Sequence, residues 1–175
     1  MTDFEDALTI ILHHEGGLSD DPRDPGGITK FGISIKFAGS INLDIDGDGK
    51  TTGEDIRALT RDHASRLYKQ HFWLPLRCDQ INDYGLALMM FDCGVNQGIG
   101  ASAKLLQRSV GAVPDGQVGP LTLASIARHG DYPTIITEFA ARRGKRYAET
   151  NNFDRFGLGW MRRVFQVHSE SLSTN

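Results

Sequence analysis

Apolar side chains recur at helical spacing from the start of the chain. Phe4, Leu8, Ile11 and Glu15 share one face of a helix with 3.6 residues per turn, so the pattern predicts a first helix whose core-facing side ends at Glu15. The pair Gly16-Gly17 then ends the helix, because glycine adopts the left-handed conformation that is common after a helix.

A turn-rich segment and a short β element follow this helix. Residues 18–27 hold two prolines with repeated Asp and Gly, which is a turn-forming composition. Residues 28–35 alternate between apolar and polar positions and predict a short strand or hairpin.

The rest of the chain has helical periodicity. One pattern runs from Glu54 to Phe72-Trp73 and is stopped by Pro75, and residues 84–96 are apolar almost all round, as in a buried central helix. Further helices are predicted at 101–110, 120–128, 133–149 and 158–169. We therefore expect an α+β, mostly helical fold with a small N-terminal β-hairpin. We expect one domain over residues 1–175, in which residues 1–75 and 76–175 pack as one unit.

Composition narrows the class of protein. The chain has 175 residues, of which 39% are hydrophobic, and no apolar run approaches the roughly 20 residues that span a bilayer, so we expect no stable membrane anchor. The N-terminus is acidic where a secretory signal is basic, which predicts synthesis in the cytoplasm. A net charge of -3 argues against general nucleic-acid binding. Two cysteines, Cys78 and Cys93, are too few for a disulfide framework, and we expect them to be unpaired. Separately, we expect the protein to be a monomer.

An acidic loop follows the predicted hairpin. It reads Asp44-Ile-Asp46-Gly-Asp48-Gly-Lys50-Thr-Thr-Gly-Glu-Asp55, with acids at positions 1, 3 and 5 and glycine at position 6, as in an EF-hand. Lys50 at position 7 offers a backbone carbonyl, and the aspartate at position 12 makes the loop similar to the calcium loops of dockerin modules. We expect structural Ca²⁺ bound by Asp44, Asp46, Asp48, Lys50 and Asp55, although acid- and glycine-rich turns also occur without metal.

The segment that begins at Glu15 has the features of a glycosidase site. It places one carboxyl group at the end of a helix and further carboxylates, including Asp24, in the loop that follows. Cleavage of a glycosidic bond needs one acid to protonate the leaving oxygen and a second carboxylate to stabilise the sugar cation or activate water. The adjacent pair His13-His14 is not a zinc motif, because His-Glu-x-x-His is absent.

Two longer runs carry a family resemblance. The first is Glu15-Gly-Gly followed by Asp21-Pro-x-Asp24-Pro-Gly-Gly-x-Thr29-x-x-Gly32-Ile. It resembles the N-acetylmuramidase family of phage endolysins, glycoside hydrolase family 108. The second is similar to the peptidoglycan-binding-type region that follows this motif in the family, and it reads Phe91-Asp92-x-x-Val95-Asn96-x-Gly98, then Leu106-Gln107, then Asp115-Gly116-x-x-Gly119-Pro120-x-Thr122.

The resemblance implies a lysozyme-like fold and cleavage of the β-1,4 bond between N-acetylmuramic acid and N-acetylglucosamine in bacterial peptidoglycan. It implies that Glu15 is the catalytic acid and that Asp24, with Thr29, positions the attacking water. It also implies that no cofactor takes part in catalysis. A phage enzyme of this kind is made in the host cytoplasm and reaches the cell wall in the periplasm after release by a holin.

Several alternatives stay open at this stage. Asp24 suits a turn as well as a catalytic role, and Thr29 suits a hairpin. Asp92, Asn96 and Gln97, at the end of the predicted central helix, either line the sugar cleft or cap the helix. A lytic transglycosylase would use Glu15 alone, and a non-catalytic, calcium-dependent wall-binding protein would not need it.

The basic run at 142–146 is a further open question. It contains four Lys or Arg residues, interrupted by one glycine. A solvated helix face is the commoner outcome for such a run, and contact with anionic groups of the cell envelope is the other.

Overall fold

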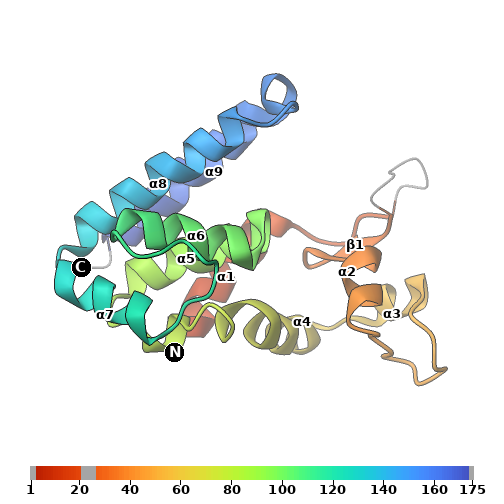
Figure 1. Ribbon diagram of the computed structural model, residues 1–175. Helices are drawn as coiled ribbons and strands as arrows, with labels where there is room; N and C mark the ends of the chain where they lie inside the picture. The colour runs from red at the N-terminus through yellow and green to blue at the C-terminus, as the bar shows by residue number, and fades with distance from the viewer. Residues whose placement is uncertain (1–2, 21–26, 174–175) are drawn as a thin grey trace. The chain divides into compact units, whose positions relative to one another are not determined.

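The computed structural model describes residues 3–20 and 27–173 and divides the chain into two compact units, residues 1–69 and residues 70–175 (Figure 1). The architecture is mostly helical with a two-stranded hairpin near the N-terminus, which confirms the predicted fold class. The boundary at 75/76 expected from the sequence stays a prediction. The packing of the two parts as one unit stays a prediction.

The first unit is built on two helices. Helix α1 (Asp3–Glu15) has three acidic residues in its first turn, where the positive end of the helix dipole favours them, and it buries the apolar face that the sequence predicts. Helix α4 (Arg61–Tyr68) contacts α1. Polar bonds join the two helices, since the Ser65 hydroxyl donates to Glu5 Oε1 at 3.3 Å and Arg61 Nη2 donates to Thr9 Oγ1 at 3.1 Å.

The predicted hairpin is confirmed and is very short. Strands β1 (Thr29–Lys30) and β2 (Ile33–Ser34) are antiparallel, with Thr29 opposite Ser34 and Lys30 opposite Ile33. The two-residue turn between them, Phe31-Gly32, has positive φ at both positions (53° and 75°), as a type I′ turn requires. Helix α2 (Ile35–Ser40) follows at once and was not predicted; the side chain of Ser34 caps it by accepting the N–H of Phe37.

The single helix predicted from Glu54 to Trp73 is wrong, because the chain forms three short elements there. Helix α3 (Gly53–Ala58) is followed by α4 and then by a π-helical turn, η1 (Lys69–Trp73). The break comes at Thr60, whose hydroxyl accepts the N–H of His63 while His63 Nδ1 accepts the N–H of Thr60. This reciprocal cap starts a new helix, so the apolar periodicity spans two helices.

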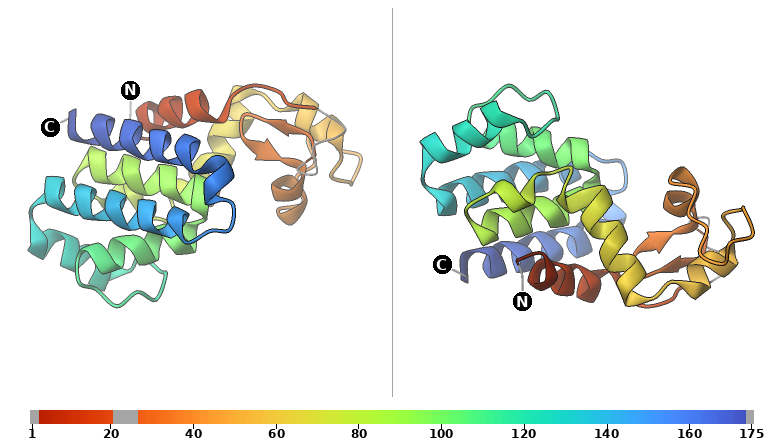
Figure 2. Two further views of the ribbon diagram at one scale, coloured as in Figure 1. Left: turned by 90° about the horizontal axis from the view of Figure 1, so that it is seen from above. Right: turned by 90° about the horizontal axis from the view of Figure 1, so that it is seen from below.

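The second unit is assembled around one buried helix. Helix α5 (Tyr84–Gln97) buries ten consecutive residues, Gly85–Gly94, and contacts α6, α8 and α9, which surround it in Figure 2. Gly85 lies so close to the Ser171 carbonyl that a Cβ there would overlap it. The predicted central helix is confirmed. The other elements of this unit are the 3₁₀ turn η2 (Cys78–Gln80), α6 (Ile99–Ser109), α7 (Pro120–His129), α8 (Tyr132–Ala148) and α9 (Phe153–Ser173).

The two cysteines are buried and unpaired, as expected from the sequence. Burial raises the pKa of the Cys93 thiol to about 11, so this thiol stays protonated at neutral pH. Within the described part of the chain, no helix has the length and apolar character needed to cross a membrane.

Candidate active site

Glu15 is the last residue of α1 and lies against the turn of the hairpin. Its side chain is half-buried, and its Oε1 atom is shielded from solvent. A Cβ at Gly32 would lie 2.8 Å from Glu15 Cγ and 2.9 Å from Glu15 Cβ, distances that carbon atoms do not tolerate. Glycine is therefore required at position 32 for two reasons. The backbone there has positive φ, and the Glu15 side chain occupies the space that a Cβ would need.

Tyr68 fixes the same turn from the other side. It is the last residue of α4 and is buried, and its hydroxyl donates to the Phe31 carbonyl at 2.9 Å. A Cβ at Gly32 would also collide with the Tyr68 hydroxyl oxygen. The end of α1, the turn of the hairpin and the end of α4 thus meet at one point, and the Glu15 side chain lies there.

Thr29 lies in β1 and has well-defined backbone partners. Two backbone hydrogen bonds link it to Ser19, one in each direction, at 2.8 and 2.9 Å. Its hydroxyl donates to the Gly27 carbonyl at 3.5 Å. These contacts account for Thr29 as a hairpin residue, and its catalytic role stays a prediction. Asp24 lies outside the described residues.

Charged groups tie the hairpin to α3. Both Nε and Nη2 of Arg57 donate to Asp20 Oδ2, at 3.2 and 2.8 Å, and Nη1 donates to Glu54 Oε1 at 2.8 Å. Lys30 Nζ donates to the Arg57 carbonyl at 2.5 Å. The residues on each side of the segment 21–26 are therefore held: Asp20 by Arg57, and Ser19 with Thr29 by the backbone bonds described above.

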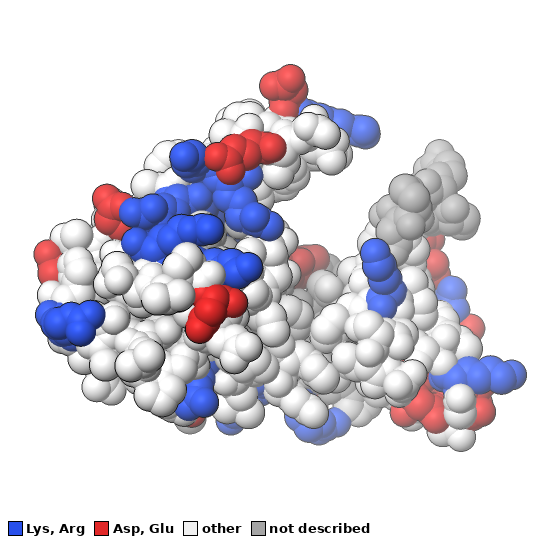
Figure 3. Space-filling model, viewed as in Figure 1, with Lys and Arg blue, Asp and Glu red and all other residues white. Residues whose placement is uncertain are grey.

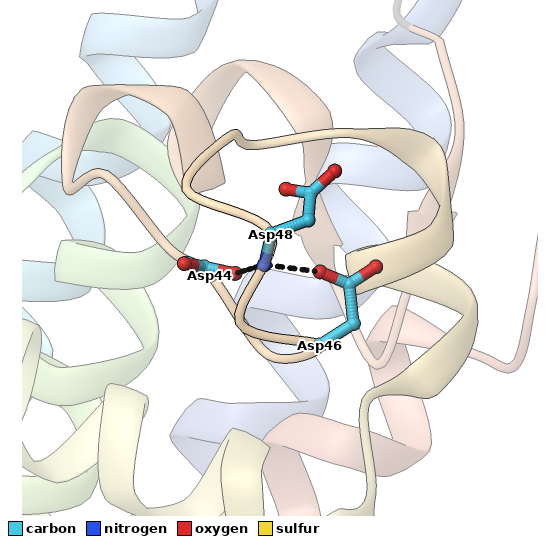
Figure 4. Close-up of side chains that lie close together, drawn as sticks. All are labelled: Asp44, Asp46 and Asp48. Carbon is cyan, nitrogen blue, oxygen red and sulfur yellow. Dashed lines mark hydrogen bonds between the residues drawn. The ribbon is translucent and has the colours of Figure 1, made fainter.

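The acidic loop brings three of its predicted ligands together. Asp44, Asp46 and Asp48 are exposed, and one oxygen from each lies within 4.8 Å of the others. Oxygen atoms that bind one Ca²⁺ at 2.3–2.6 Å are at most about 5 Å apart, so this spacing fits a shared ion. The Asp48 N–H lies between the carboxylates of Asp44 and Asp46 and donates to Asp44 Oδ1 and Asp46 Oδ1, both at 3.1 Å (Figure 4).

The two further predicted ligands are Lys50, in the loop, and Asp55, in the first turn of α3. Lys50 donates its backbone N–H to Asp48 Oδ1 at 2.8 Å. Asp55 is buried, and its oxygens accept the N–H groups of Thr52 (2.7 Å), Ile45 (2.6 Å) and Asp46 (3.4 Å) and the Thr52 hydroxyl. The bonds from Thr52 and Ile45 lower the pKa of Asp55 below its ordinary value. Four donors occupy the lone pairs of this carboxylate, so calcium ligation by Asp55 requires it to exchange some of these bonds.

The side chains that were expected to bind sugar from α5 behave differently from one another. Asp92 is fully buried: Arg163 donates to its Oδ1 at 2.9 and 2.7 Å, and Arg143 Nη1 lies 2.6 Å from its Oδ2. Burial alone would raise the pKa of Asp92, but the charges of Arg143 and Arg163 outweigh it and the pKa lies below its usual range. Asp92 thus joins α5, α8 and α9 through its ion pairs, and its role in binding sugar stays a prediction. Asn96 is exposed, and its Oδ1 accepts a hydrogen bond from the Tyr147 hydroxyl. Gln97 is half-buried.

Sequence reasoning missed the two residues that hold the turn against Glu15. In the sequence, Tyr68 is one residue within the helical pattern from Glu54 to Trp73, and Gly32 is one position of the family motif. The Phe-Gly pair between two alternating runs was the available signal, because a two-residue hairpin turn needs residues that accept positive φ.

Comparison with known proteins identifies the family to which this chain belongs. Residues 8–98, just over half of the chain, match the family described as Glycosyl hydrolase 108. A solved structure, that of Brucella abortus SagA, is 30% identical and superposes with a TM-score of 0.85, covering 97% of this chain and 94% of that one. No curated protein matches. The matched segment includes Glu15 and the hairpin, and the protein is a glycoside hydrolase that belongs to the glycosyl hydrolase 108 family.

Proposed function

We propose that this protein is a peptidoglycan hydrolase that cleaves the β-1,4 bond between N-acetylmuramic acid and N-acetylglucosamine, with Glu15 as the general acid. The observation that carries the proposal is the position of Glu15 at the end of α1, packed on Gly32 with one carboxyl oxygen shielded from water. Family membership supports a glycoside hydrolase with peptidoglycan as its substrate.

The chemistry assigned to Glu15 is the transfer of its proton to the glycosidic oxygen as the bond to the anomeric carbon breaks. The leaving sugar keeps the proton as a hydroxyl hydrogen, and positive charge builds on the ring left behind. Water then adds to the anomeric carbon. We assign the uptake of the water proton to Asp24, with the Thr29 hydroxyl orienting the water molecule. The contacts of Gly32 and Tyr68 support this mechanism by limiting where the acid can lie.

The stereochemistry follows from the separation of the two carboxyl groups. A separation of roughly 6.5–9.5 Å leaves room for water and gives inversion, whereas about 5–5.5 Å gives retention through a covalent intermediate. We propose inversion. NMR observation of the first product formed from a soluble muropeptide oligomer tests this proposal: an α-anomer at the new reducing end supports it, and a β-anomer contradicts it.

The reaction class is tested by mass spectrometry of purified peptidoglycan after digestion. Hydrolysis leaves reducing N-acetylmuramic acid ends, and these are the products that we expect. Reducing N-acetylglucosamine ends would place the cut at the other glycosidic bond. Anhydro-muramic ends would show a lytic transglycosylase, and an undigested sample would show a protein that binds the wall without cutting it.

We also propose that the acidic loop binds Ca²⁺ in a structural role, with Asp44, Asp46 and Asp48 as its acidic ligands. Their mutual distances support a shared ion. An ion that binds only the folded protein stabilises it, by about 2.7 kcal/mol at a hundred times Kd. We therefore expect EGTA to lower Tm by several degrees and added calcium to restore it.

The matched variants for the calcium proposal are Asp46→Asn in the loop and Asp62→Asn on α4, both at exposed positions. The loop variant should lose the calcium-dependent rise in Tm, and the α4 variant should keep it. Identical melting curves of the wild type in calcium and in EGTA would contradict the proposal.

A further inference from the structure

The second unit carries a basic pocket between α6 and α8 that the proposed glycosidase chemistry does not use. The pocket has a volume of about 280 Å³ and is lined by Leu105 and Arg108 of α6 together with Arg142, Lys145, Arg146 and Glu149 of the α8 end. Lys and Arg side chains gather over these two helices on the face seen in Figure 3.

The spacing along α8 explains how the pocket forms. Arg142, Lys145, Arg146 and Glu149 recur at intervals of three and four residues and so share one face of the helix. Arg108 faces them from α6, and buried Leu105 gives the pocket an apolar side. Four cations against one acid give the lining a formal charge of +3.

Neighbouring acids neutralise little of this charge. Arg142 Nη2 lies 3.4 Å from Glu138 Oε2, and Lys145 Nζ lies 3.9 Å from Glu149 Oε1, a long separation for an ion pair. In residues 3–20 and 27–173, neither Arg108 nor Arg146 has a carboxylate partner.

Arg142 also has an N–H group that can still donate a hydrogen bond. Its Nε is buried, and it has no acceptor among the residues that the structure describes. Like charges at this spacing destabilise a helix. Their concentration around a hollow is therefore a cost that a bound anion would remove.

We propose that this pocket binds phosphate groups. Three guanidinium groups offer planar forks of N–H donors, and Lys145 adds a point charge, a set that matches a tetrahedral oxyanion with acceptors on several sides. A single planar carboxylate accepts one such fork and leaves most of the charge of the pocket unbalanced. The phosphate comes either from free phosphate compounds or from the headgroups of anionic lipids.

The test is a titration of the full-length protein with inorganic pyrophosphate, followed by backbone amide shifts, beside sedimentation with vesicles of phosphatidylglycerol or of phosphatidylcholine. We expect pyrophosphate to shift amides of α6 and α8. Phosphatidylglycerol vesicles sediment the protein if lipid is the source, and phosphatidylcholine vesicles leave it in solution. Glu15→Gln binds like the wild type, so failure of the hydrolase proposal is recognised separately.

Two double variants with equal charge loss make the test specific to the pocket. Arg108→Gln/Arg146→Gln removes two lining cations, and Arg155→Gln/Arg162→Gln removes two exposed cations on α9. We expect the pocket variant to weaken phosphate binding by roughly tenfold or more and the control to keep it within about twofold. Equal weakening in both variants, equal binding of succinate, or no binding of either phosphate probe would overturn the proposal.

Discussion

The two units of this protein hold their side chains in place in different ways. In residues 70–175, long helices pack on α5, ten consecutive residues of which are buried, and the central charged groups form the Asp92–Arg143–Arg163 cluster. In residues 1–69, the elements around Glu15 are strands of two residues and helices of six to thirteen. These are positioned by a tight turn, reciprocal caps and single hydrogen bonds such as that from Tyr68.

This difference separates the residues that mainly determine stability, in the second unit, from those that position the candidate catalytic group, in the first. A buried helix depends on many interchangeable apolar contacts, so its residues affect folding more than any one reaction. The candidate site depends on a few contacts that have no substitute, such as the one between Gly32 and Glu15. Variants in the second unit should therefore change stability, and variants around the turn should change the rate.

Asp92→Asn should give the largest effect on stability. The change leaves two guanidinium groups facing a neutral amide in the core, and breaking a buried ion pair in this way costs about 3–5 kcal/mol. The control Glu138→Gln removes an exposed ion pair on α8 and should cost less than about 1 kcal/mol. Urea unfolding followed by circular dichroism measures both, and a loss in Asp92→Asn no larger than that of the control would contradict the structural role of the cluster.

The same cluster gives the wild type an acid-sensitive contribution to stability. The pKa of Asp92 is lowered in the folded state, so its contribution is complete above the pKa of the unfolded chain, about 3.9. It is lost as pH falls through the folded-state pKa. We expect the urea midpoint of the wild type to drop below pH 4 more steeply than that of Asp92→Asn.

Gly32→Ala should have the largest effect on rate that does not come from removing a catalytic group. The added methyl group must displace Glu15 or Tyr68, and a shift of about 1 Å at a reacting group costs on the order of 10²-fold. Gly111→Ala is the control, because Gly111 also has positive φ (68°) but nothing within 4 Å of an added Cβ. Both variants should lose about 1–2 kcal/mol of stability from backbone strain. Equal rates in the two variants would show that the Gly32 contact does not position the acid.

Tyr68→Phe should change stability less than Asp92→Asn does and the rate less than Gly32→Ala does. It removes the bond to the Phe31 carbonyl and keeps the ring, so stability should fall by about 0.5–1.5 kcal/mol. The rate of peptidoglycan digestion should fall less than in Gly32→Ala, because the turn stays in place and loses only one of its supports. A Tyr68→Phe rate as low as that of Gly32→Ala would assign the tyrosine hydroxyl a direct part in the reaction.

The sequence predicted the long elements well and the short ones poorly. Helices such as α5 and α8 are visible because apolar spacing repeats over many turns. The break at Thr60 and the helix after Ser34 depend on single caps, which change the chain direction without interrupting the apolar pattern. Asp92 stood out as polar in an apolar helix, but its partners come from α8 and α9, 51 and 71 positions further along the chain, beyond the reach of local spacing.

The most direct test of the central claim is the initial rate of release of soluble fragments from purified peptidoglycan by Glu15→Gln. Glu5→Gln is the matched control, because it makes the same change on α1 at a residue bonded to Ser65 and not to the turn. We expect the rate to fall about 10²–10⁴-fold in Glu15→Gln, with Tm close to that of the wild type, and to stay within about twofold in Glu5→Gln. A Glu15→Gln protein that is folded and digests peptidoglycan at the wild-type rate would contradict the account.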